Sequence, residues 1–132
     1  MLDERVKEML SSGMWDIATS DGAQPNVVPV AFKEITPDGK LLVGDVFLET
    51  TLRNIKLNGN VAISVYDPAT LQGYQIKGTA SYITSGKIVD NFKAIVEKMF
   101  KGAATAKGAL IITPARVIVT TPGADNKKEL EH

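Results

Sequence analysis

Cysteine is absent from this chain, and its one histidine is the last of its 132 residues. The ending Leu130-Glu131-His132 resembles the start of a cloning tag, so we leave His132 out of the functional argument. Nucleophilic schemes that pair Ser or Cys with His are then excluded, as are zinc sites built on thiolates or imidazoles. Acidic residues do not cluster at a spacing that suits a metal, so no metal site is expected. Any chemistry would have to be carried by a cofactor.

An excess of either charge is also missing, because 15 basic residues balance 15 acidic ones. This balance gives no sign of nucleic-acid binding, and no block of charge indicates a membrane surface. No apolar run approaches the roughly 20 residues that span a bilayer, and the charged residues 1–6 are unlike a signal peptide. We therefore expect a cytoplasmic protein without nucleic-acid or membrane partners. The nucleotide-binding patterns GxGxxG and GxxxxGK[ST] are absent as well.

Apolar residues recur with two periods, which together predict three helices and six strands. Spacings of three and four predict helices that begin near residues 2, 50 and 88 and end near residues 13, 58 and 102. Strands are predicted over residues 14–20, 27–35, 40–43, 61–66, 71–84 and 108–121. Short turns between most strands favour an antiparallel barrel with peripheral helices over a doubly wound parallel sheet. The fold class is thus mainly β (α+β). One domain is expected over residues 1–126, followed by a loose polar tail over residues 127–132.

Prolines and glycines mark where these strands are interrupted. Pro29 is unusual within a central strand, and it indicates an edge, a bulge or an irregular segment near a ligand. Gly73 and Gly78 are expected bend points, and Pro114 is expected to bend or break the last strand. Trp15, the sole tryptophan, is expected in the core or at an interface.

The best candidate for an anion site is the run Glu49-Thr50-Thr51-Leu52-Arg53-Asn54 at the start of the second helix. A helix N-terminus offers free backbone N–H groups and the positive end of its dipole. Two hydroxyls, an amide and a guanidinium lie within one turn of it, a cluster that suits a phosphate monoester. A helix capped by one of the two threonines would show the same residues, and on spacing alone that arrangement is the more common.

A second polar cluster lies in the fifth strand, where Gln75 and Lys77 share one face and Tyr74 and Ile76 share the other. The polar face is either a ligand-binding surface or the solvated outside of a barrel, and the pattern does not distinguish the two. Asp45 follows the third strand and is either a ligand-facing carboxylate or a turn residue, with the turn favoured.

Several segments together resemble a known family. They are residues 18–30, 40–45 with Thr51-Leu52-Arg53-Asn54-Ile55, 60–67, 73–80, and the late residues 106–108 and 122–124. In order and spacing they resemble the pyridoxamine 5′-phosphate oxidase-like, FMN-binding split-barrel proteins, particularly the small FMN-binding proteins. No single motif carries the likeness, which extends over nearly the whole chain.

This resemblance implies a six-stranded antiparallel split β-barrel that pairs as a homodimer, with two FMN molecules between the subunits. It implies that the FMN phosphate is held near Thr51 and Asn54. It also implies that the isoalloxazine ring lies against the strands at residues 28–30 and 43–45. The strand that contains Pro29 would then press on the ring rather than continue a regular ladder.

Two departures from the family pattern bear on function. The position before Thr51 is often basic in relatives and is Thr50 here, so Arg53 or Lys77 would have to supply the positive charge. If neither does, FMN affinity should be weaker. The additional substrate-phosphate residues and the longer C-terminal segment of the true oxidases are not found, so pyridoxamine phosphate oxidase activity is not expected.

The sequence therefore predicts an FMN-binding flavoprotein with a redox role, as an oxidoreductase or in electron transfer. The alternatives are a non-enzymatic flavin carrier and a deazaflavin (F420)-binding reductase of the same fold. No side chain stands out as an acid or a base, so catalytic residues are unassigned and enzymatic activity, such as that of a flavin reductase, stays open. Besides the second subunit, a redox protein or a nicotinamide donor is the expected partner. The predicted FMN contacts are Val28, Pro29, Val30, Val43, Gly44, Asp45, Thr50, Thr51, Arg53, Asn54, Gln75 and Lys77.

Overall fold

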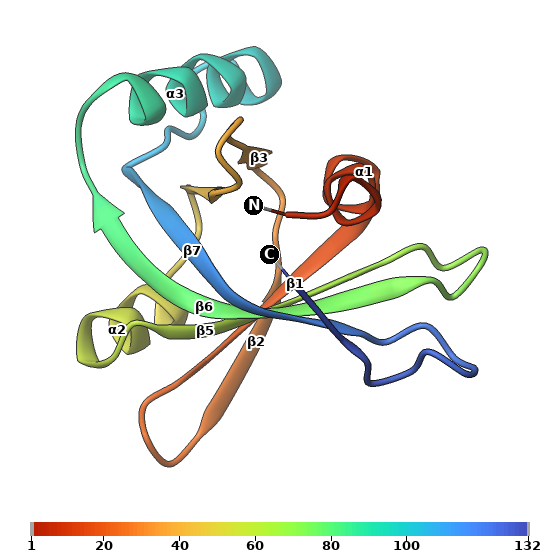
Figure 1. Ribbon diagram of the computed structural model, residues 1–132. Coiled ribbons are helices and arrows are strands. Elements are labelled where there is room, and N and C mark those ends of the chain that lie inside the picture. The colour runs from red at the N-terminus through yellow and green to blue at the C-terminus, as the bar shows by residue number, and fades with distance from the viewer. Residues whose placement is uncertain (1, 132) are drawn as a thin grey trace.

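The computed structural model describes residues 2–131, which form one strongly curled antiparallel sheet with three helices around it (Figure 1). The strands hydrogen-bond in the order β2-β1-β5-β6-β7-β4-β3, and β8 pairs with β7. This is the predicted mainly β, split-barrel architecture, and all three predicted helices are present. The elements are α1 (Glu4–Ser12), β1 (Met14–Ser20), β2 (Pro25–Pro29), β3 (Lys33–Ile35), β4 (Leu41–Asp45), α2 (Thr50–Leu57), β5 (Asn60–Tyr66), β6 (Gly73–Ile83), α3 (Lys87–Phe100), β7 (Gly108–Val119) and β8 (Glu129–Leu130).

Over its described residues the chain forms eight strands where the sequence predicted six. The predicted strand over residues 27–35 is two strands, β2 and β3, which pair with different neighbours. β2 pairs with β1 as far as Pro29, and β3 begins at Lys33 and pairs with β4. The other addition is β8, which pairs with residues 117–118 of β7. The tail therefore belongs to the sheet at Glu129 and Leu130, whereas we expected it to be loose.

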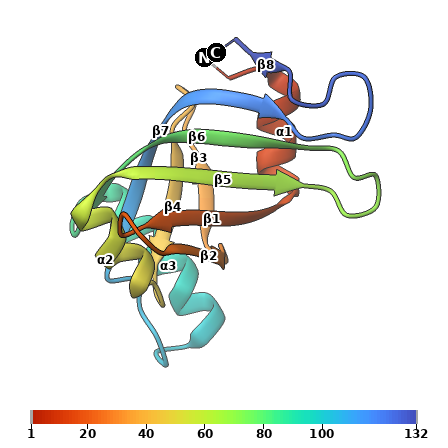
Figure 2. The ribbon, with the colours of Figure 1, turned by 90° about the horizontal axis from the view of Figure 1, so that it is seen from below.

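Residues 30–32 connect the two ends of the strand order. The backbone N–H of Val30 donates to the carbonyl of Trp15 in β1 at 2.9 Å, and that of Gly44 in β4 donates to the carbonyl of Phe32 at 2.8 Å. Because β2 and β3 are the first and last strands of the order, this short link closes the curled sheet on itself. Figure 2 shows α1 and α2 at opposite ends of β5.

Two apolar cores stabilise the curl. The larger one lies inside the sheet and includes Trp15, which is 1% exposed and donates from Nε1 to the carbonyl of Leu10 at 2.8 Å. Trp15 is thus a core residue, one of the two expected placements. The smaller core lies under α3, around Phe92 and Val96. Within residues 2–131, no helix has the length and apolar character needed to cross a membrane.

The irregularity expected near Pro114 is a β-bulge rather than a break. β7 is continuous, and the register of the β6–β7 pair shifts between Lys77 and Gly78, where Gly78 lies opposite Pro114. A Cβ atom on Gly78 would lie 2.3 Å from the carbonyl oxygen of Thr113. The close approach of the two strands therefore requires glycine at this position, and Gly78 is a bend point as predicted.

Candidate functional site

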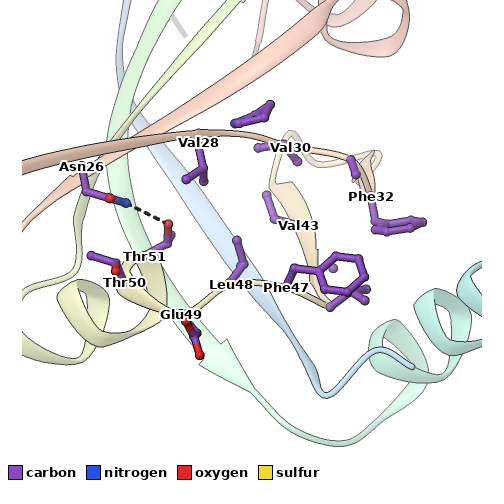
Figure 3. Close-up of a pocket in the computed structure, with 14 residues that line it drawn as sticks. Asn26, Val28, Val30, Phe32, Val43, Phe47, Leu48, Glu49, Thr50 and Thr51 are labelled. Atoms are coloured by element: carbon purple, nitrogen blue, oxygen red, sulfur yellow. Dashed lines mark hydrogen bonds between the residues drawn. The ribbon is translucent and has the colours of Figure 1, made fainter. Parts of the chain in front are cut away.

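A cavity of about 290 Å³ lies between β2, β4 and the first turn of α2 (Figure 3). In Figure 3, Val28 and Val30 lie on one side of it, and Val43 and Leu48 lie on the other. The polar side chains gather at the end nearest α2. Its lining residues are Asn26, Val28, Pro29, Val30, Ala31, Phe32, Val43, Gly44, Val46, Phe47, Leu48, Glu49, Thr50 and Thr51.

The local sequence explains why the cavity forms here. β2 is an edge strand that ends at Pro29, and residues 30–32, which continue from it towards β3, form one wall of the cavity. On the opposite wall, a Cβ atom on Gly44 would lie 2.8 Å from Cδ1 of Phe92 and 3.1 Å from Cβ of Phe32. Gly44 thus allows β4 to pack closely against the core under α3. Of the readings of Pro29, the structure shows both an edge strand and an irregular segment beside a cavity.

Two side-chain amides of the surrounding segments hold the start and the end of α2 in place. Nδ2 of Asn26 in β2 donates to Oγ1 of Thr51 at 3.2 Å, across the polar end of the cavity (Figure 3). Nδ2 of Asn58, just after the helix, donates to the carbonyl of Ser20 at 2.8 Å. The helix begins at Thr50 with Glu49 at the N-cap and without a side-chain capping bond. The expectation that a threonine caps this helix was therefore wrong, because the Thr51 hydroxyl is used across the cavity instead.

Asp45 leads from β4 into the loop over residues 46–49, and all four residues of that loop line the cavity. Its carboxylate is fully buried and accepts hydrogen bonds from the Leu48 backbone N–H at 3.2 Å and from the Tyr82 hydroxyl at 2.6 Å. Desolvation by burial, the hydrogen bond to Asp45 and the charge of Asp45 together raise the pKa of Tyr82 to about 12. Asp45 thus fixes the loop, in agreement with the favoured turn reading.

Seven of the predicted FMN contacts are brought together by the fold, and five lie elsewhere. Asn54 is buried between α2 and β1, and Asp45 is buried beneath the loop. Arg53 is exposed on α2 and is not part of the cavity lining, and neither are Gln75 and Lys77 of β6. Lys77 lines a separate hollow with Asn58 and Asn60. The seven that line the cavity are Val28, Pro29, Val30, Val43, Gly44, Thr50 and Thr51.

Other lining residues were missed by the sequence analysis. Asn26 lies two positions before Val28 in the same strand, so the alternation of a strand already indicated that both face the same side. Phe47 belongs to a loop for which no periodic pattern exists. It is 69% exposed and its ring lies edge-on to that of Phe100 at 5.9 Å. Phe100 also contacts Phe32 at 6.1 Å, so the aromatic wall extends from the cavity to α3.

The arrangement suits a flat, largely apolar ligand with a polar end. Its walls are aliphatic and aromatic, and the hydroxyls and backbone N–H groups of the first turn of α2 lie at one end. Glu49 is the single charged residue among the described residues that line it. Within residues 2–131, no group of three or more His, Cys, Asp or Glu side chains is placed to hold a metal ion.

Comparisons with known proteins agree with this architecture. The sequence profile of the family described as pyridoxamine 5′-phosphate oxidase matches residues 2–124. An uncharacterized protein of Methanocaldococcus jannaschii is 29% identical over 130 residues, which cover 97% of this chain and 86% of that protein. The crystal structure of HupZ from Group A Streptococcus has a TM-score of 0.80 at 26% identity, covering 95% of this chain and 98% of HupZ. An FMN-binding protein from Syntrophomonas wolfei has a TM-score of 0.79 at 14% identity, covering 92% and 87% of the two chains. That last likeness shows the fold alone.

Proposed function

This chain belongs to the pyridoxamine 5′-phosphate oxidase family, and from that premise we propose that it is a flavoprotein that holds FMN in the cavity between β2, β4 and α2. The cavity itself is the observation that carries the proposal, because it gathers residues from three separate elements into one apolar slot. The structural likeness to an FMN-binding protein of the same fold supports it.

The residues present fit the ring of a flavin. The backbone of residues 28–30 forms one wall, and the β4 residues Val43 and Gly44 form the facing wall. Leu48 lines the cavity between these walls and the start of α2. Apolar walls with a few polar groups at one end are typical of cofactor sites. The hydroxyls of Thr50 and Thr51 lie at that end and would meet the polar side chain of the flavin.

We propose a redox role for the complex, as an oxidoreductase or in electron transfer. A bound flavin supplies electron or hydride transfer. The residues of this chain bind and orient the ring, and the apolar side chains of Val28, Val43 and Leu48 exclude water from its surroundings. Because Glu49 is the one titratable side chain among the described lining residues, the chain itself offers the reaction little acid or base catalysis.

We also propose that two copies of the chain form a homodimer that completes the site. The cavity of about 290 Å³ is at the lower end of the roughly 300–1,000 Å³ that ligand pockets occupy. Phe47 at its rim is 69% exposed, and a second copy would cover it. Sedimentation at micromolar concentration should show a dimer, and a monomer that still binds FMN with full affinity would contradict this part of the proposal.

The test of cofactor binding is a titration of the purified chain with FMN, followed by flavin absorption and fluorescence. The substitution Val28→Phe fills the cavity from β2, and we expect it to abolish saturable binding. Val27→Phe is the matched control, because Val27 is 65% exposed on the opposite face of the same strand and should bind as the wild type does. Circular dichroism melts of both variants show whether they fold. If the wild type does not bind FMN, or if both variants bind equally, the cavity is not the site.

The same preparation distinguishes a catalyst from a carrier. Steady-state oxidation of NADH or NADPH in the presence of FMN would establish an oxidoreductase, such as a flavin reductase. Stable FMN binding without turnover would favour an electron carrier or a flavin carrier. Saturable binding of F420 in place of FMN would instead favour a deazaflavin reductase, because both ligands bring a flat ring and a phosphate to the same site.

A further inference from the structure

We propose that the phosphate of a bound flavin adds little to its affinity for this site, so that riboflavin and FMN bind with similar strength. The inference rests on the proposed flavin-binding function and concerns which part of the flavin this chain recognises. It follows from the charges around the polar end of the cavity.

The cavity carries charge of the wrong sign for a phosphate. Its fourteen lining residues include one charged side chain, the carboxylate of Glu49, and no lysine or arginine. Glu49 is the N-cap of α2 and therefore precedes Thr50 and Thr51, whose hydroxyls would meet a phosphate. Glu49 is itself exposed, so solvent screens part of its charge, but its carboxylate still repels a phosphate monoester, which carries about −1.5 to −2 charges near neutral pH.

The basic side chains of neighbouring elements are placed elsewhere. Arg53 is exposed on α2 and does not line the cavity. Lys77 lies in a different hollow with Asn58 and Asn60. Nζ of Lys56 is placed over the ring of Tyr82, at 6.0 Å from its centroid. None of these three side chains, in the subunit whose cavity holds the flavin, therefore supplies the charge-assisted hydrogen bonds that make phosphate sites strong.

The start of α2 offsets part of this deficit without reversing it. The N–H groups of the first helical turn and the positive end of the helix dipole attract an anion. The carboxylate of Glu49 lies at the same helix end and interacts with the same dipole, which reduces the attraction left for a ligand. The ring and the sugar-like chain are common to riboflavin and FMN, so the apolar walls stabilise both equally.

The experiment compares riboflavin and FMN titrations of the full-length chain by flavin fluorescence in one buffer. We expect dissociation constants that agree within about threefold, whereas one charge-assisted hydrogen bond to the phosphate would separate them by about tenfold or more. Added salt should strengthen FMN binding slightly, because it screens the repulsion by Glu49. A phosphate held by cations would respond in the opposite direction.

Two variants test the cause of this behaviour. Glu49→Gln should raise FMN affinity several-fold and leave riboflavin affinity unchanged, and Thr50→Lys should raise FMN affinity further. Glu97→Gln is the matched control, because Glu97 is exposed on α3 away from the cavity, and neither affinity should change.

The possible failures are distinguishable. If the wild type binds FMN about tenfold or more tighter than riboflavin, the inference is overturned, whichever chain of a dimer supplies the cation, while the proposed function stands. Equal responses of both flavins to Glu49→Gln would also overturn it. If neither flavin binds, the proposed function fails and this inference fails with it.

Discussion

Nδ2 of Asn54 lies 3.1 Å from Oγ1 of Thr19, and this hydrogen bond joins α2 to β1 inside the protein. Both side chains are buried, with 4% and 5% of their surfaces exposed. The sequence predicted that Asn54 contacts the flavin phosphate. In the structure its amide is used to orient the helix that forms the polar end of the cavity.

Replacing Asn54 by alanine should therefore reduce stability. The Asn54→Ala variant leaves the buried Thr19 hydroxyl without this donor, and we expect the free energy of unfolding to fall by about 1–3 kcal/mol. Urea unfolding followed by circular dichroism measures this change. Arg53→Ala is the control, because Arg53 is exposed and its loss should change stability by less than about 0.5 kcal/mol. Equal effects of the two substitutions would show that the buried bond contributes nothing of its own.

The hydroxyl of Tyr82 is the next group whose removal should be costly. Tyr82→Phe leaves the fully buried Asp45 carboxylate with the Leu48 N–H as its remaining hydrogen-bond donor. We expect a loss of about 1–3 kcal/mol in the free energy of unfolding at pH 7. Because Asp45 holds the loop over residues 46–49, flavin should also dissociate faster from this variant. Tyr66→Phe is the control, and an equal loss of stability there would argue against a special role for the Tyr82–Asp45 bond.

Alkaline pH should weaken the wild type more than the Tyr82→Phe variant. The pKa of Tyr82 is about 12 in the folded protein, against an ordinary value of 10.0, so the unfolded chain releases this proton first. The stability that the neutral hydroxyl contributes is complete below pH 10 and is lost as the pH rises through about 12. Urea midpoints measured from pH 9 upward should therefore converge for the two proteins. Parallel curves would mean that the pKa of Tyr82 is unchanged by folding.

A methyl group at Gly44 should disturb the cavity wall and the core behind it. The added Cβ atom would lie 2.8 Å from the ring of Phe92, closer than real Cβ contacts allow. We expect Gly44→Ala to destabilise the protein by about 1–3 kcal/mol, as overpacked cores do. Gly22→Ala is not a suitable control, because the backbone φ of Gly22 is +100°. Ala18→Gly is the control instead, since it changes a half-buried position on the outer face of β1. The thermal midpoint of Gly44→Ala should fall well below that of the wild type, and an unchanged midpoint would show that Phe92 moves aside freely.

Much of this architecture could be read from the sequence, because periodicity reports which residues share a face. The strands and helices follow from alternating and helical spacings, and Pro29 indicated an irregular segment near a ligand, which is the wall of the cavity. Helical phase could also have placed Asn54 correctly. Thr51 and Asn54 lie three residues apart and are both buried, whereas Arg53 falls on the exposed side. The sequence analysis treated residues 49–54 together as one phosphate site, and so it did not separate the buried positions from the exposed one.

Long-range pairing is what local patterns could not supply. Leu42 of β4 pairs with Ile111 of β7, far along the chain, and no turn sequence connects these strands. The face of β6 that carries Gln75 and Lys77 was left open for a related reason, since alternation groups residues without saying which group faces inward. The buried Ile76 between them settles this point. Phe47 has no such periodicity. Leu48 shares the helical spacing of Leu52 and Ile55, but it lies before the helix begins, and its backbone N–H is held by Asp45.

Phe47 offers the most selective test of ligand binding, because it lines the cavity while 69% of its surface is exposed. Its exposed ring contributes little to folding, so Phe47→Ala should leave the unfolding free energy within about 0.5 kcal/mol of the wild type. A flavin bound beside it would bury part of the ring, and losing that contact should weaken FMN binding by about 5- to 30-fold. Leu57→Ala is the matched control, since Leu57 is 67% exposed on α2 and does not line the cavity. Fluorescence titration of both variants decides the matter, with sedimentation to show that each remains a dimer: equal FMN affinities would place the flavin away from the 46–49 loop, whereas a selective loss in a dimeric Phe47→Ala would place it against that loop.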